Sequence, residues 1–186
     1  MAVIPVEADI TLLNSARQMN KEALVKIFDL YSSAIYNYAL RICNDPLEAD
    51  HIVGDVFAKL LEQFSNGHGP NNNLRSYLFE ATYHLVIDRA RSARRQAPLE
   101  AVDFLRADGQ STVSKSEDRI LFESVIRIIK DQLTEDQRHV IVLRFLEGFS
   151  LQETATIIGK AVSNVKVIQN RAISALRKSL DHQVVK

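Results

Sequence analysis

The chain has 186 residues, of which 46% are hydrophobic, and its 23 basic and 23 acidic residues give a formal net charge of zero. This length allows one large or two small domains with a buried core. The low content of Gly and Pro favours helices. The sequence has no long apolar stretch and no signal-peptide pattern, so we expect neither a membrane span nor secretion. A single cysteine, Cys43, excludes an internal disulfide and suits the reducing cytoplasm.

The charges are unevenly distributed along the chain. Residues 1–87 hold six Lys or Arg against ten Asp or Glu, a balance of −4. Residues 160–186 hold six against one, a balance of +5, and residues 89–95 hold four Arg and no acid. Two basic segments in an otherwise acidic chain predict contact with phosphate groups at two places.

The first half of the chain predicts three helices. Residues 1–19 lack clear periodicity, so we expect a loose or partly helical lead-in. Apolar residues at steps of three and four predict helices over 21–43 and about 46–64, and a third over about 74–95. Between the last two, the turn-forming residues of SNGHGPNNN (65–73) predict a loop.

The second half predicts a linker and four helices. Residues 97–118 break all periodicity, and a helix follows over about 117–131. Thr134 with Gln137, and Ser150 with Glu153, predict capping boxes for two helices that end at Gly148 and near Gly159. The last helix spans about 163–180. No segment alternates as a strand, so the sequence predicts an all-α chain of two small helical domains joined by a flexible linker, with borders at 20–96, 97–118 and 119–186.

The last two helices predict a helix-turn-helix. The first would bury Leu151, Ala155, Ile157 and Ile158, and the second would bury Val162, Val165, Ile168, Ala172, Ile173 and Leu176. This leaves an outer face of Ser163, Asn164, Lys166, Val167, Asn170 and Arg171. Amides, a hydroxyl, cations and a valine suit the base edges, phosphates and thymine methyls of a major groove. The alternative is an ordinary helical hairpin with a solvated basic face.

Two blocks of sequence resemble bacterial sigma factors. Residues 133–180 contain LTEDQR, VLRFLEGFS and NVKVIQNRAISALR, and they resemble region 4, which binds the promoter −35 element. Residues 24–96 contain FDLYSSAIYNYALRI, EADHIVGDVFAKLLE and LRSYLFEATYHLVIDRARSARR, and they resemble region 2. Their order and spacing are similar to the extracytoplasmic-function (ECF) group, whose two domains are joined directly by a linker.

The resemblance implies a subunit that binds RNA polymerase core and directs it to promoters. It implies contacts with the β′ clamp and the β flap of the polymerase and with promoter DNA, an inhibitory anti-sigma factor, no cofactor and no chemistry of its own. The residues that match the polymerase-docking segment are Asp50, Val53, Asp55, Val56 and Phe57. We expect Val53 and Phe57 to be mainly core, with Asp50 and Asp55 facing the partner.

The resemblance also assigns the −10 element to the third helix and the loop before it. The loop with Asn72 and Asn73 and the start of the helix with Tyr77 match the segment that captures a flipped base. Tyr83 and His84 lie where the helix would meet the unpaired strand, and Arg89, Arg91, Arg94 and Arg95 continue along it as contacts with phosphates. We expect Arg138 and Arg144 to support the −35 contacts. The alternatives are that His84 is an ordinary surface residue and that part of the arginine cluster serves the helix dipole.

Three positions depart from the common family pattern. Ser163-Asn164 stands in place of Gly-Thr, Gly54 in place of Gln, and Tyr77 in place of Trp. The first leaves the −35 sequence open.

Other function classes fit less well. An enzyme would need a metal-ligand or nucleophile motif, which the five scattered histidines do not provide. A DNA-binding regulator that ignores polymerase would not need EADHIVGDVF, and a helical adaptor would need no basic segments.

Overall fold

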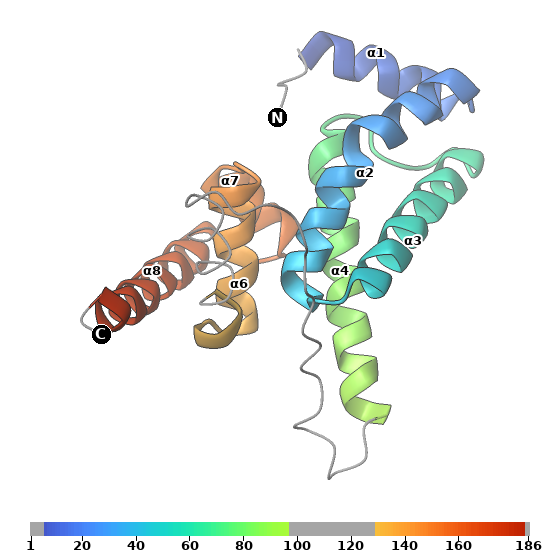
Figure 1. The fold of residues 1–186 in the computed structure, drawn as a ribbon. Coiled ribbons are helices and arrows are strands. Elements are labelled where there is room, and N and C mark those ends of the chain that lie inside the picture. Colours follow the sequence, from blue (N-terminus) through green and yellow to red (C-terminus); the bar gives the residue numbers. More distant parts are fainter. Residues whose placement is uncertain (1–5, 97–128, 185–186) are drawn as a thin grey trace. The chain divides into compact units, whose positions relative to one another are not determined.

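The computed structural model describes residues 6–96 and 129–184, and every regular element within those two ranges is a helix. They divide into two compact units, one built from α1 to α4 and the other from α6 to α8 (Figure 1). The all-α prediction is therefore confirmed. The linker expected at 97–118 and most of the helix expected at 117–131 lie outside the described residues.

The first unit consists of α1 (Val6–Arg17), α2 (Lys21–Cys43), α3 (Pro46–Ser65) and α4 (Leu74–Gln96). The last three agree with the predicted ranges. Two asparagines fix where helices begin. The side chain of Asn20 accepts a hydrogen bond from the backbone N–H of Ala23 at 2.9 Å, and the side chain of Asn73 accepts one from the backbone N–H of Ser76 at 3.1 Å. These bonds satisfy N–H groups that the first turn of a helix leaves without partners.

The core of the first unit lies between α2, α3 and α4. Ile35, Tyr38, Ile52, Val56, Leu78 and Phe79 are all fully buried there. The rings of Tyr38 and Phe79 pack with their centroids 5.4 Å apart. Burying each large apolar side chain stabilises the fold by about 2 kcal/mol. The core therefore fixes α3 and α4 against each other, and with them the polar residues on their outer faces.

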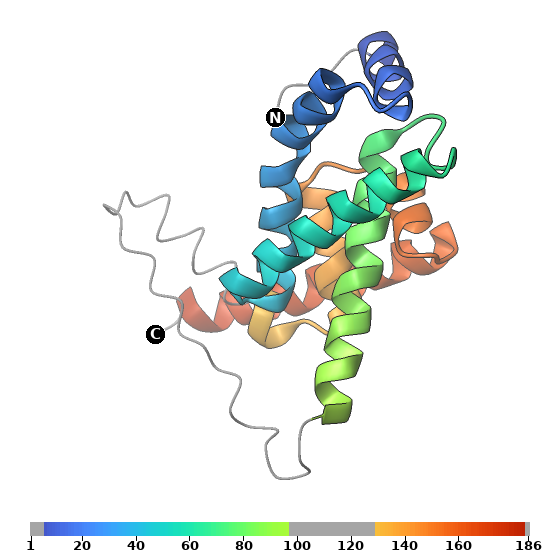
Figure 2. The ribbon, with the colours of Figure 1, turned by 90° about the vertical axis from the view of Figure 1, so that its right-hand side faces the viewer.

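The lead-in expected at residues 1–19 contains a twelve-residue helix, α1. Leu13 and Ala16 of α1 are buried, and the helix contacts α3. Both views show α1 across the end of the bundle where α3 leads into α4 (Figures 1 and 2). This helix agrees with the expectation of a partly helical lead-in, although the sequence did not indicate its bounds.

The second unit contains α6 (Glu135–Ile141), a π-helical segment η1 (Val142–Leu146), α7 (Leu151–Ile157) and α8 (Val162–Val184). Both predicted capping boxes are present, at Thr134 with Gln137 and at Ser150 with Glu153. Gly148 and Gly159 have φ angles of +74° and +63°. This left-handed conformation suits glycine and allows the chain to turn sharply on either side of α7.

The core of the second unit agrees with the predicted hairpin. Ala155, Ile157, Ile158, Val165 and Ala172 are buried, and the other predicted core positions of α7 and α8 are partly buried. Thr154, which the pattern did not indicate, is fully buried as well. Contacts of α8 with both α6 and α7 then leave one face of α8 uncovered.

Candidate nucleic-acid interface

The outer face of α8 contains all six residues that the sequence predicts for −35 recognition. Each of them is exposed, including Val167, whose side chain is 47% accessible. None of the six side chains makes a hydrogen bond or ion pair within the described part of the chain. A helix face of this kind can offer amides, a hydroxyl and two cations to a ligand without first losing internal contacts.

Two basic side chains, Lys160 and Arg144, hold the hairpin in place. Lys160, in the turn before α8, pairs with Asp136 of α6 at 3.0 Å. Arg144 of η1 donates from Nε to Gln169 of α8 at 3.0 Å and from Nη1 to the backbone oxygen of Phe149. Arg144 therefore supports α8 through Gln169. Among the described residues, the Arg138 side chain makes no such contact with α8.

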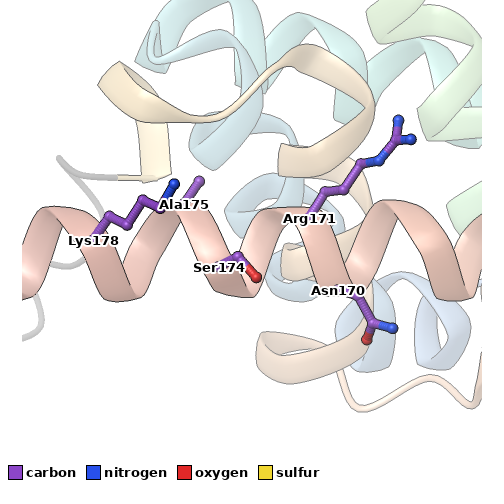
Figure 3. A pocket seen from close by; sticks show the side chains of 5 residues that line it. All are labelled: Asn170, Arg171, Ser174, Ala175 and Lys178. Atoms are coloured by element: carbon purple, nitrogen blue, oxygen red, sulfur yellow. The ribbon is translucent and has the colours of Figure 1, made fainter.

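Further along α8, a small open cavity is lined by Asn170, Arg171, Ser174, Ala175 and Lys178. Figure 3 shows Asn170 and Ser174 on one side of the helix and Arg171 and Lys178 on the other. Arg171 and Lys178 are seven residues apart, which is about two helical turns. The predicted set did not include Ser174 and Lys178, and the seven-residue spacing between Arg171 and Lys178 could have indicated the latter.

The residues predicted for the −10 element do not share one environment. In the loop, Asn72 and Asn73 are exposed, but the Asn73 side chain caps α4. His84 is exposed and lies 4.0 Å from Glu80. Tyr77 is partly buried, and this burial, together with the charge of Glu80, raises the pKa of its hydroxyl. The hydroxyl therefore remains protonated at neutral pH and can donate a hydrogen bond.

Among the described side chains of the predicted −10 set, Tyr83 is the most buried. We expected it to meet DNA, but it is 9% exposed. It follows Phe79 by one turn and precedes Val86 by another, and both of these residues are buried. Helical periodicity thus directs most of the Tyr83 ring into the bundle. The ring also makes a T-shaped contact with the neighbouring, exposed His84 ring, at a centroid distance of 5.4 Å.

The arginines of α4 do not form one uniform track. Arg89 donates to Glu48 at 2.8 Å and to Asp55 at 2.5 Å, both on α3. Burial lowers the pKa of Arg89, but the hydrogen bonds and charges of the two carboxylates outweigh it and raise that pKa above its ordinary value. Arg91 is exposed, 3.9 Å from Asp88, and Arg95 is exposed. The Arg94 side chain lies outside the described part.

On α3, the residues predicted for polymerase docking divide into core and surface. Val53, Val56 and Phe57 are buried, as expected for Val53 and Phe57, while Asp50 and Asp55 are exposed. Five residues turn a helix through about 140°, so the two acids point in different directions. Asp55 faces α4, where it binds Arg89, and Asp50 does not share that contact.

An exposed apolar patch on α2 and α3 was not predicted. It consists of Val25, Phe28 and Leu61, and Phe28 is 46% exposed. The Phe28 ring packs on Phe57 with a centroid distance of 4.8 Å. A partner that covers such a patch gains hydrophobic stabilisation. The periodicity of α2 places Phe28 on the apolar stripe with Leu24 and Tyr31, so the sequence pattern favoured a buried Phe28 and did not indicate its exposure.

His139 is a buried residue that the sequence did not single out. It lies in α6 and is fully buried. Burial, with a smaller effect of Arg138, lowers its pKa to about 3 against the opposing effect of Asp136. The imidazole is therefore neutral at physiological pH. Across the described ranges, no three His, Cys, Asp or Glu residues gather as metal ligands, and no helix there is long and apolar enough to cross a membrane.

Comparison with known families identifies both units. Residues 27–96 match the family model of sigma-70 region 2, and residues 131–178 match that of sigma-70 region 4. The ECF RNA polymerase sigma factor SigX of Bacillus subtilis is 28% identical over 166 residues, which are 87% of this chain and 85% of SigX. The ECF RNA polymerase sigma factor SigL of Mycobacterium tuberculosis is 27% identical over 157 residues, which are 83% of this chain and 86% of SigL.

Two solved structures have a similar fold. CnrH, solved in complex with the cytosolic domain of CnrY, has a TM-score of 0.70 at 21% identity, over 94% of this chain and 97% of that one. RpoE of Bartonella quintana, solved with the anti-sigma factor NepR, has a TM-score of 0.60 at 22% identity, over 84% of this chain and 95% of the RpoE chain. These two structures show the shared fold. The two matched regions and the relatives show that the chain belongs to the ECF group of the sigma-70 family, which directs promoter-specific transcription initiation by RNA polymerase.

Proposed function

We propose that this sigma factor divides promoter recognition between its two units, with α8 reading the −35 element and the first unit binding the −10 element and polymerase core. The observation that carries the proposal is the outer face of α8. Six side chains suited to a major groove are exposed there without internal partners in the described residues. The bonds from Lys160 and Arg144 hold this helix ready to bind, which reduces the ordering that binding requires.

For the −10 element, we assign base reading to Asn72 and strand contacts to Tyr77, His84, Arg91 and Arg95. Asn72 is exposed and has no hydrogen-bond partner in the described residues. Its amide can both donate to and accept from the edge of an unpaired base. Arg89 is assigned instead to holding α3 and α4 together, since it already binds two carboxylates.

For polymerase core, we assign docking on the β′ clamp to Asp50 and the exposed apolar patch of Val25, Phe28 and Leu61. An acid beside apolar side chains suits a basic, partly apolar partner helix. Asp55 contributes less directly, because Arg89 neutralises much of its charge. Contact of the second unit with the β flap remains a prediction of the family resemblance.

We further propose that an anti-sigma factor controls the protein in the cytoplasm. The support is the RpoE structure with the anti-sigma factor NepR, whose sigma chain resembles this one in fold. The uncovered basic face of α8 and the apolar patch of the first unit are the surfaces that such an inhibitor would need to cover.

The direct test is transcription with sigma-free core polymerase and genomic DNA. We expect the protein to produce a limited set of transcripts with defined starts, which core alone does not produce. A DNA-binding regulator that ignores polymerase is the second candidate, supported by the same face of α8. It would bind duplex DNA but yield no specific transcript, and that result would refute the proposed function.

A further inference from the structure

The loop at residues 65–73 is fastened at both ends. At its start, the backbone N–H groups of Gly67 and His68 donate to the carbonyl oxygens of Phe64 and Gln63, at 3.0 and 2.8 Å. At its end, the side chain of Asn73 caps α4. Within the described residues, no hydrogen bond from α3 or α4 reaches Asn71 or Asn72 in the stretch between.

Helix α1 supplies a contact at the centre of the loop. Arg17, the last residue of α1, donates from Nη1 to the side-chain oxygen of Asn71. The buried side chains of Leu13 and Ala16 anchor α1 against the bundle. Both views show α1 beside the segment that joins α3 to α4 (Figures 1 and 2). The contact therefore comes from a helix that is itself held in place.

Packing further limits the loop on its α3 side. Gly69 has a φ angle of +105°, and a Cβ there would lie 2.9 Å from Cδ1 of Phe64. The backbone thus rests directly on a buried ring, which leaves little room for another conformation. Of the three consecutive asparagines, Asn71 binds Arg17 and Asn73 caps α4. Asn72 is left between them with its amide exposed.

We propose that α1 determines how selectively the loop reads an unpaired base, with Arg17 as a positioning residue that acts through Asn71 on Asn72. This inference rests on the proposed function, and it gives a role to residues that precede region 2. The ligand is a single base displaced from the −10 duplex. An amide discriminates between bases only if its donor and acceptor are held in a fixed orientation, so the contact at Asn71 affects selectivity more than overall affinity.

The test combines a measurement on the free protein with one on the polymerase complex. In the free protein, Arg17→Ala should raise amide hydrogen exchange across 65–73, whereas Gln18→Ala should not. Gln18 is the matched control because it follows Arg17, is exposed and makes no side-chain bond in the described residues. In the complex, initiation is measured on promoters that carry each of the four bases at each −10 position.

We expect Arg17→Ala and Asn71→Ala each to reduce base discrimination at one −10 position by about five-fold, and the double variant to lose no more than either alone. Arg17→Lys should keep part of the base discrimination, because lysine can donate one hydrogen bond to the same side-chain oxygen of Asn71. Equal losses for all four bases would mean a merely structural contact and would overturn the proposal, as would unchanged discrimination. A wild-type protein that starts no specific transcript would instead refute the proposed function on which it rests.

Discussion

Helices α8 and α4 were both predicted to bind promoter DNA, but their side chains are used differently. On α8, all six predicted residues are exposed and free of side-chain partners in the described residues. On and before α4, Tyr83 is buried, Arg89 binds two acids, and Asn73 caps the helix. A binding surface on one face of one helix therefore follows directly from periodicity. A surface shared by a loop and two helices also contains polar residues that serve the fold.

The largest effect that sharpens this comparison is expected on α8. Lys166→Ala with Arg171→Ala should weaken binding to a −35 duplex by about 100-fold, since each removed contact to a base edge or phosphate is worth about 1–2 kcal/mol. The matched control removes two cations from α4 instead, Arg94→Ala with Arg95→Ala. That variant should bind the same duplex almost normally, as measured by fluorescence anisotropy at fixed salt. Equal losses would contradict separate roles for the two helices.

The second unit should also be the more acid-sensitive of the two. Below pH 6.5, the His139 imidazole binds a proton in the unfolded chain. In the folded chain it stays neutral, because its pKa there is about 3. Stability is therefore lost as pH falls from 6.5 towards 3, and the loss at pH 5 should be about 2 kcal/mol. Urea unfolding at pH 7 and pH 5, followed by a probe in each unit, measures this loss in the free energy of unfolding.

The matched variants for this pH dependence are His139→Phe and His84→Gln. His139→Phe removes the titrating group and should reduce the difference between the two pH values. His84→Gln should leave that difference unchanged, because His84 is exposed on α4. A difference that persists in His139→Phe would assign the acid sensitivity to another group.

A smaller effect separates the arginines of α4. Arg89→Ala should destabilise the first unit by about 1 kcal/mol, because it removes two partly exposed ion pairs to α3. Arg91→Ala should change stability very little, since its contact with Asp88 is long and exposed. Thermal unfolding of both variants checks the difference. Equal stability of the two would mean that Arg89 does not hold α3 and α4 together.

The smallest effect concerns Gly54, where the family commonly has glutamine. A Cβ added at Gly54 would meet no atom within 4 Å, and the residue lies inside α3. Gly54→Ala should therefore stabilise the first unit by about 0.5–1 kcal/mol through helix propensity. Transcription should be unchanged, since the alanine methyl group is small. A destabilised variant would indicate that α3 requires glycine here for another reason.

These contrasts explain how far the sequence alone could predict the molecule. Short-range signals were reliable: the capping boxes at Thr134 and Ser150 and the glycines around α7 lie where the pattern indicated. Contacts between residues far apart in the chain could not be predicted in this way. Arg89 meets Glu48 across 41 residues, and Arg17 meets Asn71 across 54. No local pattern specifies which arginine of a cluster finds an acid on a neighbouring helix.

The most direct test of the division between the two units is the base preference of the complete polymerase complex on a promoter library randomised at both elements. We expect Lys166→Ala to change the preferred bases only in the −35 element, and Asn72→Ala to change them only in the −10 element. If the two variants altered the same element, or if neither altered any base preference, the separate roles of α8 and the first unit would be contradicted.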